Sequence, residues 1–494
     1  MRFFKDKKNL SNTTNTTNGK ISPNLQVNLF NLKQTFTLTP NLTFREVTIH
    51  EGKIDGTLVY LRDLADLKQI EEHIIPPLYS KDGQQSSHTT IADYQKTSYL
   101  QEVVNGLLNG STVLLLNEHN EAYIYNTAGG PSRSIEDAIF ETTLKGSHLG
   151  FSEQIGQNIA LLQQFIPSPK LKIAEIKLQG ELNRSVSLVY IDGTAKEEEI
   201  AELTRRITGI QGDHLINLGQ LAEYIEDNHF SPFPQFRISE RPDQATIDLF
   251  KGKICVLLDR SPSVLIAPGS IMSFFQSVDD YTTRWMLASF VRILRFVAVL
   301  ISIFLPAIYI SIVSFNYEII PIRLLITIGE SRAEIPFDPL VEALLMEITL
   351  EMLREAGIRL PAPVGQTVGI VGGIVIGQAA VEAGIVSNFM VIIVSLTAIS
   401  SFIIPNYDMS LGVRLMRFPM MIIASLFGVV GIAVGFMTLL GHIVKLESIG
   451  APYGTLLNPL RSSDFKDSLI RFPIWKIGKS KQSSAKDGLN ERKN

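Results

Sequence analysis

The sequence predicts an α/β cytoplasmic domain, made of two small mixed-sheet subdomains, followed by an α-helical polytopic membrane domain. The first observation is the uneven distribution of charge: Asp, Glu, Lys and Arg number 63 in residues 1–295 but only four in residues 360–441. The second is a set of charge-free runs after residue 295, long enough to cross about 30 Å of hydrocarbon at about 1.5 Å per residue. The third is the alternation of short apolar strands with helical stretches before residue 290.

The N-terminal part begins with a basic segment that is followed by a run of Asn and Thr. Its low hydrophobicity predicts that residues 1–22 are disordered. The segment has no apolar core of signal-peptide length, so we expect the following domain to remain cytoplasmic. We place the first cytoplasmic subdomain at residues 23–150 and the second at residues 151–290.

A short internal similarity links these two subdomains. Residues 110–117 (GSTVLLLN) and 252–259 (GKICVLLD) match in frame, and each is followed by apolar residues at the same offsets. Both segments read as a strand, a turn and a strand. Two explanations stay open at this level, a true repeat and a chance similarity between two hairpins.

Composition and motifs argue against several classes of protein. The formal net charge is -4, so no basic excess points to nucleic acid, and one cysteine excludes a disulfide framework or a Cys-rich metal site. Phosphate-binding, dinucleotide-binding, serine-hydrolase and HExxH motifs are absent. Cys255 lies in an apolar strand, as an inert buried thiol would. We therefore expect no enzyme activity, no cofactor and no metal site.

The membrane domain is expected at residues 291–445. Spans are predicted near 296–315, 361–382, 385–405 and 418–441. Residues 339–356 have helical periodicity but too many charges for a lipid-facing span, so they predict an amphipathic or re-entrant helix.

The C-terminal tail, residues 446–494, is basic: residues 461–494 carry nine Lys or Arg and four Asp or Glu. The excess of positive charge places the tail in the cytoplasm with the N-terminus, which requires an even number of spans. Four spans put the loop that holds Arg414 and Arg417 outside, whereas five would export the tail. We favour four.

Small and polar residues recur along the second predicted span. Gly365, Gly369, Gly373 and Gly377 recur every fourth residue and form a stripe on one helix face. The stripe has two interpretations, tight helix packing or a narrow hydrated path around a shared axis. Polar residues on the same segment favour the second: Gln366, Thr367, Gln378 and Glu382.

The preceding helix has an acidic face. Glu347, Glu351 and Glu355 lie one turn apart, which fits the wet face of an interfacial helix or a vestibule beside the glycine-rich span. The last predicted span has a second row of small residues that we assign to packing: Ala424, Gly428, Gly431 and Gly435.

Several motifs resemble the A-subunit family of bacterial spore germinant receptors, the GerA family. They include SPFPQ at 231–235, ERPD at 240–243, EALLME at 342–347, GQTVG at 365–369 and GQAAVEA at 377–383. The most specific block runs from about Phe230 to Tyr407.

The resemblance implies a multi-pass protein of the spore inner membrane, surrounded by lipid, with a cytoplasmic N-terminal domain. It also implies a transporter-like B subunit and a lipoprotein C subunit as partners, and a homo-oligomer that conducts ions in response to nutrients. A receptor scaffold or a transporter subunit without its own pore is the alternative. The resemblance carries over these pore or gating candidates: Gln366, Gly369, Gly373, Gly377, Gln378 and Glu382, with Glu342, Glu347 and Glu351 in the preceding helix.

Overall fold

The computed structural model describes residues 19–49, 54–79, 94–129, 141, 146–178, 184–210, 215–454 and 470–473. Most of the segment predicted to be disordered, and most of the C-terminal tail, lie outside these ranges. The chain divides into two compact units. The first is Met1–Thr142, Ser147–Ile225 and Ile238–Ala267, and the second is Thr143–Gly146, Glu226–Arg237 and Pro268–Asn494.

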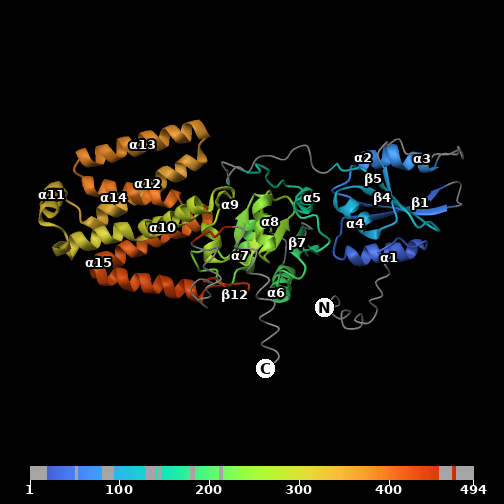
Figure 1. Cartoon of the computed structure of the whole chain (residues 1–494). Helices are drawn as coiled ribbons and strands as arrows, with labels where there is room; N and C mark the ends of the chain where they lie inside the picture. Colours follow the sequence, from blue (N-terminus) through green and yellow to red (C-terminus); the bar gives the residue numbers. More distant parts are fainter. Residues whose placement is uncertain are drawn as a thin grey trace, which may run out of the picture. The chain divides into compact units, whose positions relative to one another are not determined.

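The first unit begins with a five-stranded sheet of order β1-β2-β4-β5-β3 (Figure 1). All four strand pairings are antiparallel, although the sequence predicts a mixed sheet. Helices α1 and α4 cover one face, and η2 and α3 pack against the other. The elements are α1 (Leu25–Thr35), β1 (Leu42–Ile49), β2 (Ile54–Leu61), α2 (Leu67–Gln69), η2 (Ile70–Ile74), α3 (Ile75–Tyr79), β3 (Tyr94–Thr97), α4 (Leu100–Leu108), β4 (Thr112–Leu116) and β5 (Ala122–Tyr125).

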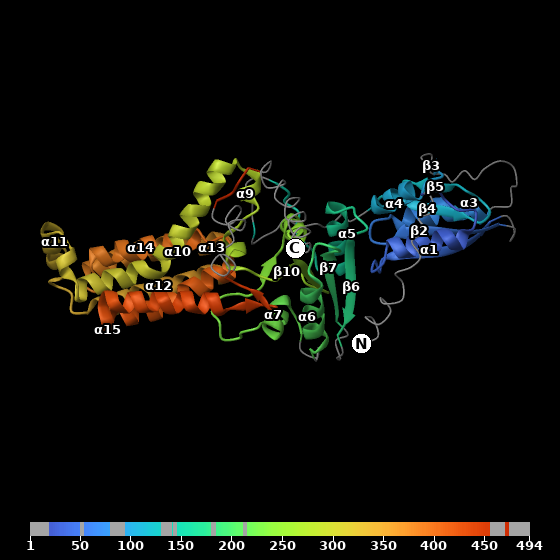
Figure 2. The ribbon, with the colours of Figure 1, turned by 60° about the horizontal axis from the view of Figure 1, so that its bottom comes forward.

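A second five-stranded sheet in the same unit has the order β6-β7-β9-β10-β8. Helices α5 and α8 share a core with one face of this sheet. Side chains alternate along a strand, so the sheet has a second face that also needs cover. Figure 2 shows α6 and α7 beside its strands. The elements are α5 (Ile155–Phe165), β6 (Leu171–Lys177), β7 (Ser185–Ile191), α6 (Glu197–Thr208), α7 (Leu218–Ile225), β8 (Arg237–Ser239), α8 (Pro242–Phe250), β9 (Ile254–Leu258) and β10 (Val264–Ala267).

The two sheets are repeats of one design, because they share strand order and local hydrogen bonds. Asn28 of α1 accepts a hydrogen bond from the Ser22 backbone N–H (2.9 Å) and donates one to the Ser22 carbonyl (2.7 Å). Asn158 of α5 makes the same two bonds with Ser152, at 2.8 and 2.6 Å. Both asparagines are 1% exposed. A matched pair of buried amides at equivalent places favours true repetition over chance.

The turns around the matching sequence segments agree as well. Gly110 and Gly252 have φ of 83° and 89°, which glycine adopts without strain. A Cβ atom at Gly110 would lie 2.8 Å from the Leu64 carbonyl oxygen, and one at Gly252 would lie 2.7 Å from that of Thr194. The short sequence similarity therefore marks the same tight turn in each repeat.

The second unit is mainly helical, which together with the two sheets confirms the predicted fold class. Its elements after β10 are η4 (Ile271–Phe275), α9 (Asp279–Thr282), α10 (Trp285–Ser314), η5 (Tyr317–Ile319), α11 (Ile322–Arg332), α12 (Pro339–Arg359), α13 (Ala362–Glu382), α14 (Asn388–Phe402), α15 (Tyr407–Lys445), β11 (Glu447–Ser448) and β12 (Ala451–Pro452).

Among the described residues, α10 and α15 pass a test of length and composition for membrane spans, with mean hydropathy of 2.6 and 2.4 over their most apolar windows. For α15 the test counts all 39 residues as one helix, although they are divided by a bend. Helix α14 has 15 residues, so at about 1.5 Å per residue it is shorter than about 30 Å of hydrocarbon. The helices coincide with the predicted spans in sequence position, and the number of membrane crossings stays a prediction.

Helix α15 changes direction at Gly428, where φ is 59° and ψ is -142°. A Cβ atom at Gly431 would lie 2.5 Å from the Ile423 carbonyl oxygen, and one at Gly435 would lie 2.6 Å from the Met420 sulfur. Residues so far apart along one straight helix cannot touch, so residues 407–427 and 429–445 form an antiparallel hairpin. The structure thus corrects the expectation of one continuous span over 418–441, and the small residues pack the hairpin's limbs together.

The SPFPQ segment packs against the open end of this hairpin. The Pro232 carbonyl oxygen approaches Gly412 of the first limb so closely that a Cβ there would lie 2.3 Å away. The Ser231 hydroxyl lies 2.9 Å from His442 Nε2 in the second limb. Ser448 Oγ donates to the Gln235 carbonyl at 2.8 Å, so β11 closes the same end. This end of the helical unit is therefore held by polar contacts.

Candidate functional site

The acidic face of α12 is paired with arginines. Glu347 accepts a hydrogen bond from Arg417 in the first limb of α15, and both side chains are 1% exposed. The rest of the Arg417 guanidinium donates to Ser302 of α10, from Nε to the carbonyl (2.8 Å) and from Nη2 to the hydroxyl (3.0 Å). One buried guanidinium thus joins α10, α12 and α15.

One turn further along α12, Glu351 bridges two arginines. Arg414 Nη1 lies 3.2 Å from its carboxylate, and Arg354 Nη1 lies 3.1 Å from it. Arg354 also donates to Ser401 Oγ of α14 (3.2 Å) and lies 4.7 Å from the ring centre of Phe402. Glu351 is half-buried, so this second pair lies nearer to the surface than the first.

At the start of α12, Glu342 is fully buried and is bound on two sides. Arg332 of α11 lies 2.6 Å from one carboxylate oxygen, while the other accepts from the Ser387 backbone N–H (3.1 Å) and hydroxyl (3.0 Å). The Ser387 hydroxyl also caps α14 by accepting from the Met390 N–H. Glu342 therefore fixes α11 and the beginning of α14 to α12.

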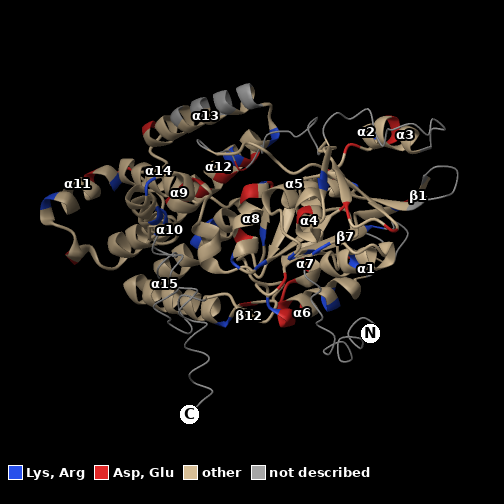
Figure 3. Cartoon of the chain, turned by 45° about the vertical axis from the view of Figure 1, so that its right-hand side comes forward, with Lys and Arg blue, Asp and Glu red and all other residues tan. Residues whose placement is uncertain are grey.

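These pairs change the interpretation of the acidic face. Glu342 and Glu347 are buried among the described residues rather than wet. Glu355 does lie on an exposed surface, where it pairs with Arg359 at 2.5 Å. Figure 3 shows the charges gathered on α12 and the mostly uncharged ribbon of α15.

Sequence reasoning missed the basic partners in this site. It placed Arg414 and Arg417 in an external loop, whereas the structure places them inside the first limb of α15, 5% and 1% exposed. The sequence did carry a signal. Residues three or four apart lie on the same face of a helix, so Arg414 and Arg417 can face Glu347 and Glu351 as two neighbouring pairs.

Helix α13 has one packed and one open set of glycines. A Cβ atom at Gly365 would lie 2.7 Å from the Gly357 carbonyl oxygen of α12, and one at Gly372 would lie 2.7 Å from Leu353. At Gly369, Gly373 and Gly377 nothing lies within 4 Å. The glycines of the predicted stripe therefore differ: Gly365 packs on α12, and the other three are free of contacts at the Cβ position in the described chain.

Two of the polar candidates of α13 lie at its C-terminal end. Gln378 Nε2 donates to Glu382 Oε1 at 2.9 Å, and both side chains are exposed. The side chains of Gln366 and Thr367 lie outside what the structure describes. Glu382 is thus exposed, whereas Glu342 and Glu347 are buried and Glu351 is half-buried, although the sequence groups them together.

A cavity of about 480 Å³ lies beside the Glu351–Arg414 pair. Its wall combines apolar side chains of α15 with the SPFPQ segment and three carboxylates. The lining residues are Glu226, Ser231, Pro232, Phe233, Pro234, Glu351, Asp408, Leu411, Gly412, Arg414, Leu415 and Phe418.

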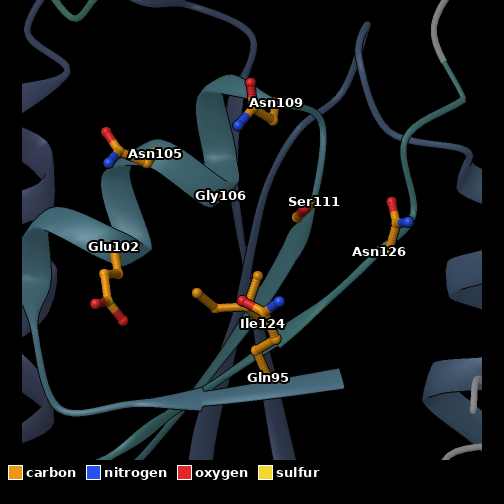
Figure 4. Close-up of a pocket in the computed structure, with 8 residues that line it drawn as sticks. All are labelled: Gln95, Glu102, Asn105, Gly106, Asn109, Ser111, Ile124 and Asn126. Carbon is orange, nitrogen blue, oxygen red and sulfur yellow. The ribbon is translucent and has the colours of Figure 1, made fainter. Parts of the chain in front are cut away.

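The first repeat has a more polar hollow of about 320 Å³ between α4 and the β3–β5 edge of its sheet (Figure 4). Four carboxamide side chains, one carboxylate and one hydroxyl surround it. The lining residues are Gln95, Glu102, Asn105, Gly106, Asn109, Ser111, Ile124 and Asn126.

Neither cavity holds a candidate metal centre among the described residues. In the described part of the chain, no group of three or more His, Cys, Asp or Glu is placed to hold a metal ion. Burial raises the pKa of the Cys255 thiol well above its ordinary value, which lowers its thiolate content. Cys255 is thus a core residue, as the sequence predicts.

The fold and these pairs define a two-part protein, with a repeated α/β region and a helical region that carries two candidate membrane helices. The family model for the Bacillus/Clostridium GerA spore germination protein matches residues 30–483, so the chain belongs to this family and the resemblance is confirmed.

Relatives cover most of the chain. It is 37% identical over 463 residues to the uncharacterized membrane protein YfkQ of Bacillus subtilis (strain 168), covering 92% of this chain and 90% of that protein. It is 37% identical over 477 residues to spore germination protein KA of the same organism (94% and 88% covered). Spore germination protein A1 of that organism is 41% identical over 382 residues (77% and 79% covered).

Among solved structures, the chain is similar to the N-terminal domain of the A subunit of the Bacillus megaterium spore germinant receptor GerK3. The TM-score is 0.40 and the identity 21%, over 50% of this chain and 96% of that one.

Proposed function

We propose that this chain is the A subunit of a nutrient germinant receptor in the spore inner membrane, where it helps to initiate germination. The support is its membership of the GerA family and its similarity to spore germination proteins over most of its length. The proposal includes a cytoplasmic N-terminal domain, a multi-pass helical region, and a B and a C subunit as partners. It includes no catalytic step.

We further propose that copies of the helical region assemble around α13 into an ion-conducting path gated by nutrients. The observation that carries this proposal is the open face of α13, where Gly369, Gly373 and Gly377 have nothing within 4 Å of a Cβ position. Small residues allow helices to approach closely, so this face suits packing against another copy. Glu382 follows Gly373 by nine residues, so at about 100° per residue it lies on the opposite side of α13. Its exposed carboxylate would therefore act at the mouth of the path rather than along the glycine face, where it would favour cations.

A receptor scaffold or transporter subunit without its own pore is the second candidate. One observation favours it: the carboxylates of Glu342, Glu347 and Glu351 are all bound by arginines within the chain. Carboxylates held in this way do not offer free negative charge to a passing cation, so these three residues would add none to a conducting path.

Cysteine accessibility along residues 364–382 separates the two candidates. Single cysteines are introduced into the receptor complex in spores and treated with a water-soluble thiol reagent, while buried Cys255 stays silent. A reactive stripe on the face of Gly369, Gly373 and Gly377 supports the pore. Uniform protection contradicts the pore and supports the scaffold.

Glu382→Gln provides the functional measurement. It should change the cation selectivity of nutrient-triggered ion release, because it removes the exposed charge from α13. Glu355→Gln is the matched control, since Glu355 is also exposed but lies on α12 with Arg359. Unchanged ion release and nutrient response in Glu382→Gln would count against the pore.

A further inference from the structure

Residues 470–473 in the C-terminal part of the chain dock on the corner between α9 and α10. Arg471 is 3% exposed although it lies in a basic tail. Its guanidinium donates to the backbone carbonyls of Thr283 (Nη1, 2.6 Å) and Tyr281 (Nη2, 3.4 Å). Those carbonyls lie at the C-terminal end of α9, where a helix leaves its last carbonyls unpaired and favours a cation.

The backbone of Arg471 is held as well. Its N–H donates to the Ser289 hydroxyl of α10 at 3.1 Å, and its carbonyl oxygen lies 3.1 Å from the same hydroxyl. Its guanidinium carbon lies 5.4 Å from the ring centre of Tyr281, and that of Arg292 lies 5.6 Å from the same ring. One residue of the tail therefore contacts both helices that form the corner.

The corner itself is a buried charge cluster that needs fixed geometry. Asp280 of α9 is 2% exposed and pairs with Arg292 and Arg295 of α10, each at 2.8 Å. Arg295 also donates to the Phe275 carbonyl at 3.0 Å. The direction in which α10 leaves the corner thus depends on a short helix whose end is closed by Arg471.

We propose that residues 470–473 form a latch that closes on the α9–α10 corner and holds the start of α10. Arg471 makes the contacts that keep this latch closed. The latch is small: it involves four residues, of which Ile470 is 44% exposed and Arg471 supplies the hydrogen bonds to the end of α9. Opening frees the end of α9 and the first turns of α10 and leaves the two sheets unchanged. The latch is independent of whether α13 lines a pore.

Hydrogen exchange of the full-length protein in lipid nanodiscs tests the latch. Arg471→Ala should speed exchange at the amides of residues 279–292 about tenfold, and leave α14 and both sheets unchanged, because only local opening is affected. Arg471→Lys should have a smaller effect, since it keeps the positive charge at the end of α9 and loses only the planar fork of the guanidinium. Arg359→Ala is the control, because Arg359 is 76% exposed in a surface pair.

Two results would overturn the latch. One is unchanged exchange at residues 279–292 in Arg471→Ala. The other is a uniform increase over all helices in both Arg471 variants, which would make Arg471 an ordinary part of the helical core. Local acceleration in both variants, with none in Arg359→Ala, supports the proposal.

Discussion

Glu347 of α12 and Arg417 of α15 are 70 residues apart in the chain and form an ion pair that is almost completely buried. Burying two charges costs less when they are paired and when hydrogen bonds satisfy their remaining groups. Ser302 of α10 accepts hydrogen bonds from Arg417 with its carbonyl and hydroxyl, whereas Glu347 Oε1 has no hydrogen-bond partner among the described residues. The pair therefore fixes the mutual position of three helices.

Glu347→Gln should destabilise the helical unit by about 3–5 kcal/mol, because it leaves Arg417 buried without a counter-charge. Adding Arg417→Met should recover part of that loss, since neither charge then remains. Thermal unfolding in detergent measures both effects. Glu355→Gln, which breaks an exposed pair, should cost less than about 1 kcal/mol. Equal costs for Glu347→Gln and Glu355→Gln would contradict the buried pair.

Gly428→Ala should destabilise the α15 hairpin by about 1–3 kcal/mol, because a residue with a Cβ is strained at a φ of 59°. The added Cβ would also lie 3.2 Å from that of Phe315 at the end of α10. Gly441→Ala serves as the control, since it lies in the second limb with nothing within 4 Å. If the two variants unfold at the same temperature, residue 428 is not the bend.

The glycines of α13 offer a matched pair of substitutions. Gly365→Ala should cost about 1–3 kcal/mol, because its methyl group meets the Gly357 carbonyl of α12. Gly373→Ala should leave the single chain unchanged or up to about 1 kcal/mol more stable, because alanine favours a helix and the position is open.

Self-association tests whether copies of the chain pack on the open face of α13. If copies pack on it, Gly373→Leu should reduce the cross-linked oligomer in membranes while the unfolding temperature of the detergent-solubilised chain is kept. An unchanged oligomer with both Gly373→Leu and Gly377→Leu would show that α13 faces no neighbour.

Asp63 makes the stability of the first unit depend on pH. Burial raises its pKa above the ordinary 3.8, although the Asn41 side chain donates to it at 3.0 Å and opposes the shift. A carboxyl with a raised pKa binds its proton more tightly in the folded state, so the free energy of unfolding falls as pH rises from 3.8 through the raised value. Asp63→Asn keeps an acceptor for Asn41 and should stabilise the protein at pH 7.

Glu202 supplies a comparison of opposite sign. Hydrogen bonds from Arg205 and Arg206 lower its pKa to about 2, so its contribution is present above the ordinary 4.5 and is lost as pH falls towards 2. Denaturant unfolding between pH 3 and 7 measures both effects. At pH 7 the free energy of unfolding should be higher in Asp63→Asn than in the parent protein, and lower in Glu202→Gln. A loss at pH 7 in Asp63→Asn would contradict the assignment to Asp63.

The sequence by itself determined the class of this protein. The scarcity of charge between residues 360 and 441, against 63 charges before residue 296, separated the helical part from the α/β part. Motifs such as GQTVG at 365–369 pointed to the family, and the matching segments at 110–117 and 252–259 marked the repeat. These are properties of composition and local pattern, so they need no knowledge of which residues meet.

Only the tertiary structure decided how the charged residues are used. Glu347, Glu351 and Glu355 look equivalent on a helical wheel, but Arg417 buries the first, Arg414 and Arg354 bind the second, and the third stays exposed. Periodicity places residues on a helix face, but it does not say which face of another helix lies opposite.

The bend at Gly428 could not be predicted from the sequence for the same reason. The apolar run over 418–441 is equally compatible with one straight helix and with two limbs, because hydrophobic periodicity reports only the local pattern. The choice depends on the contacts of Gly431 and Gly435 with residues 420–423, which exist only once the chain has turned back. Local pattern thus fixes what each segment is made of, and long-range contact fixes where it goes.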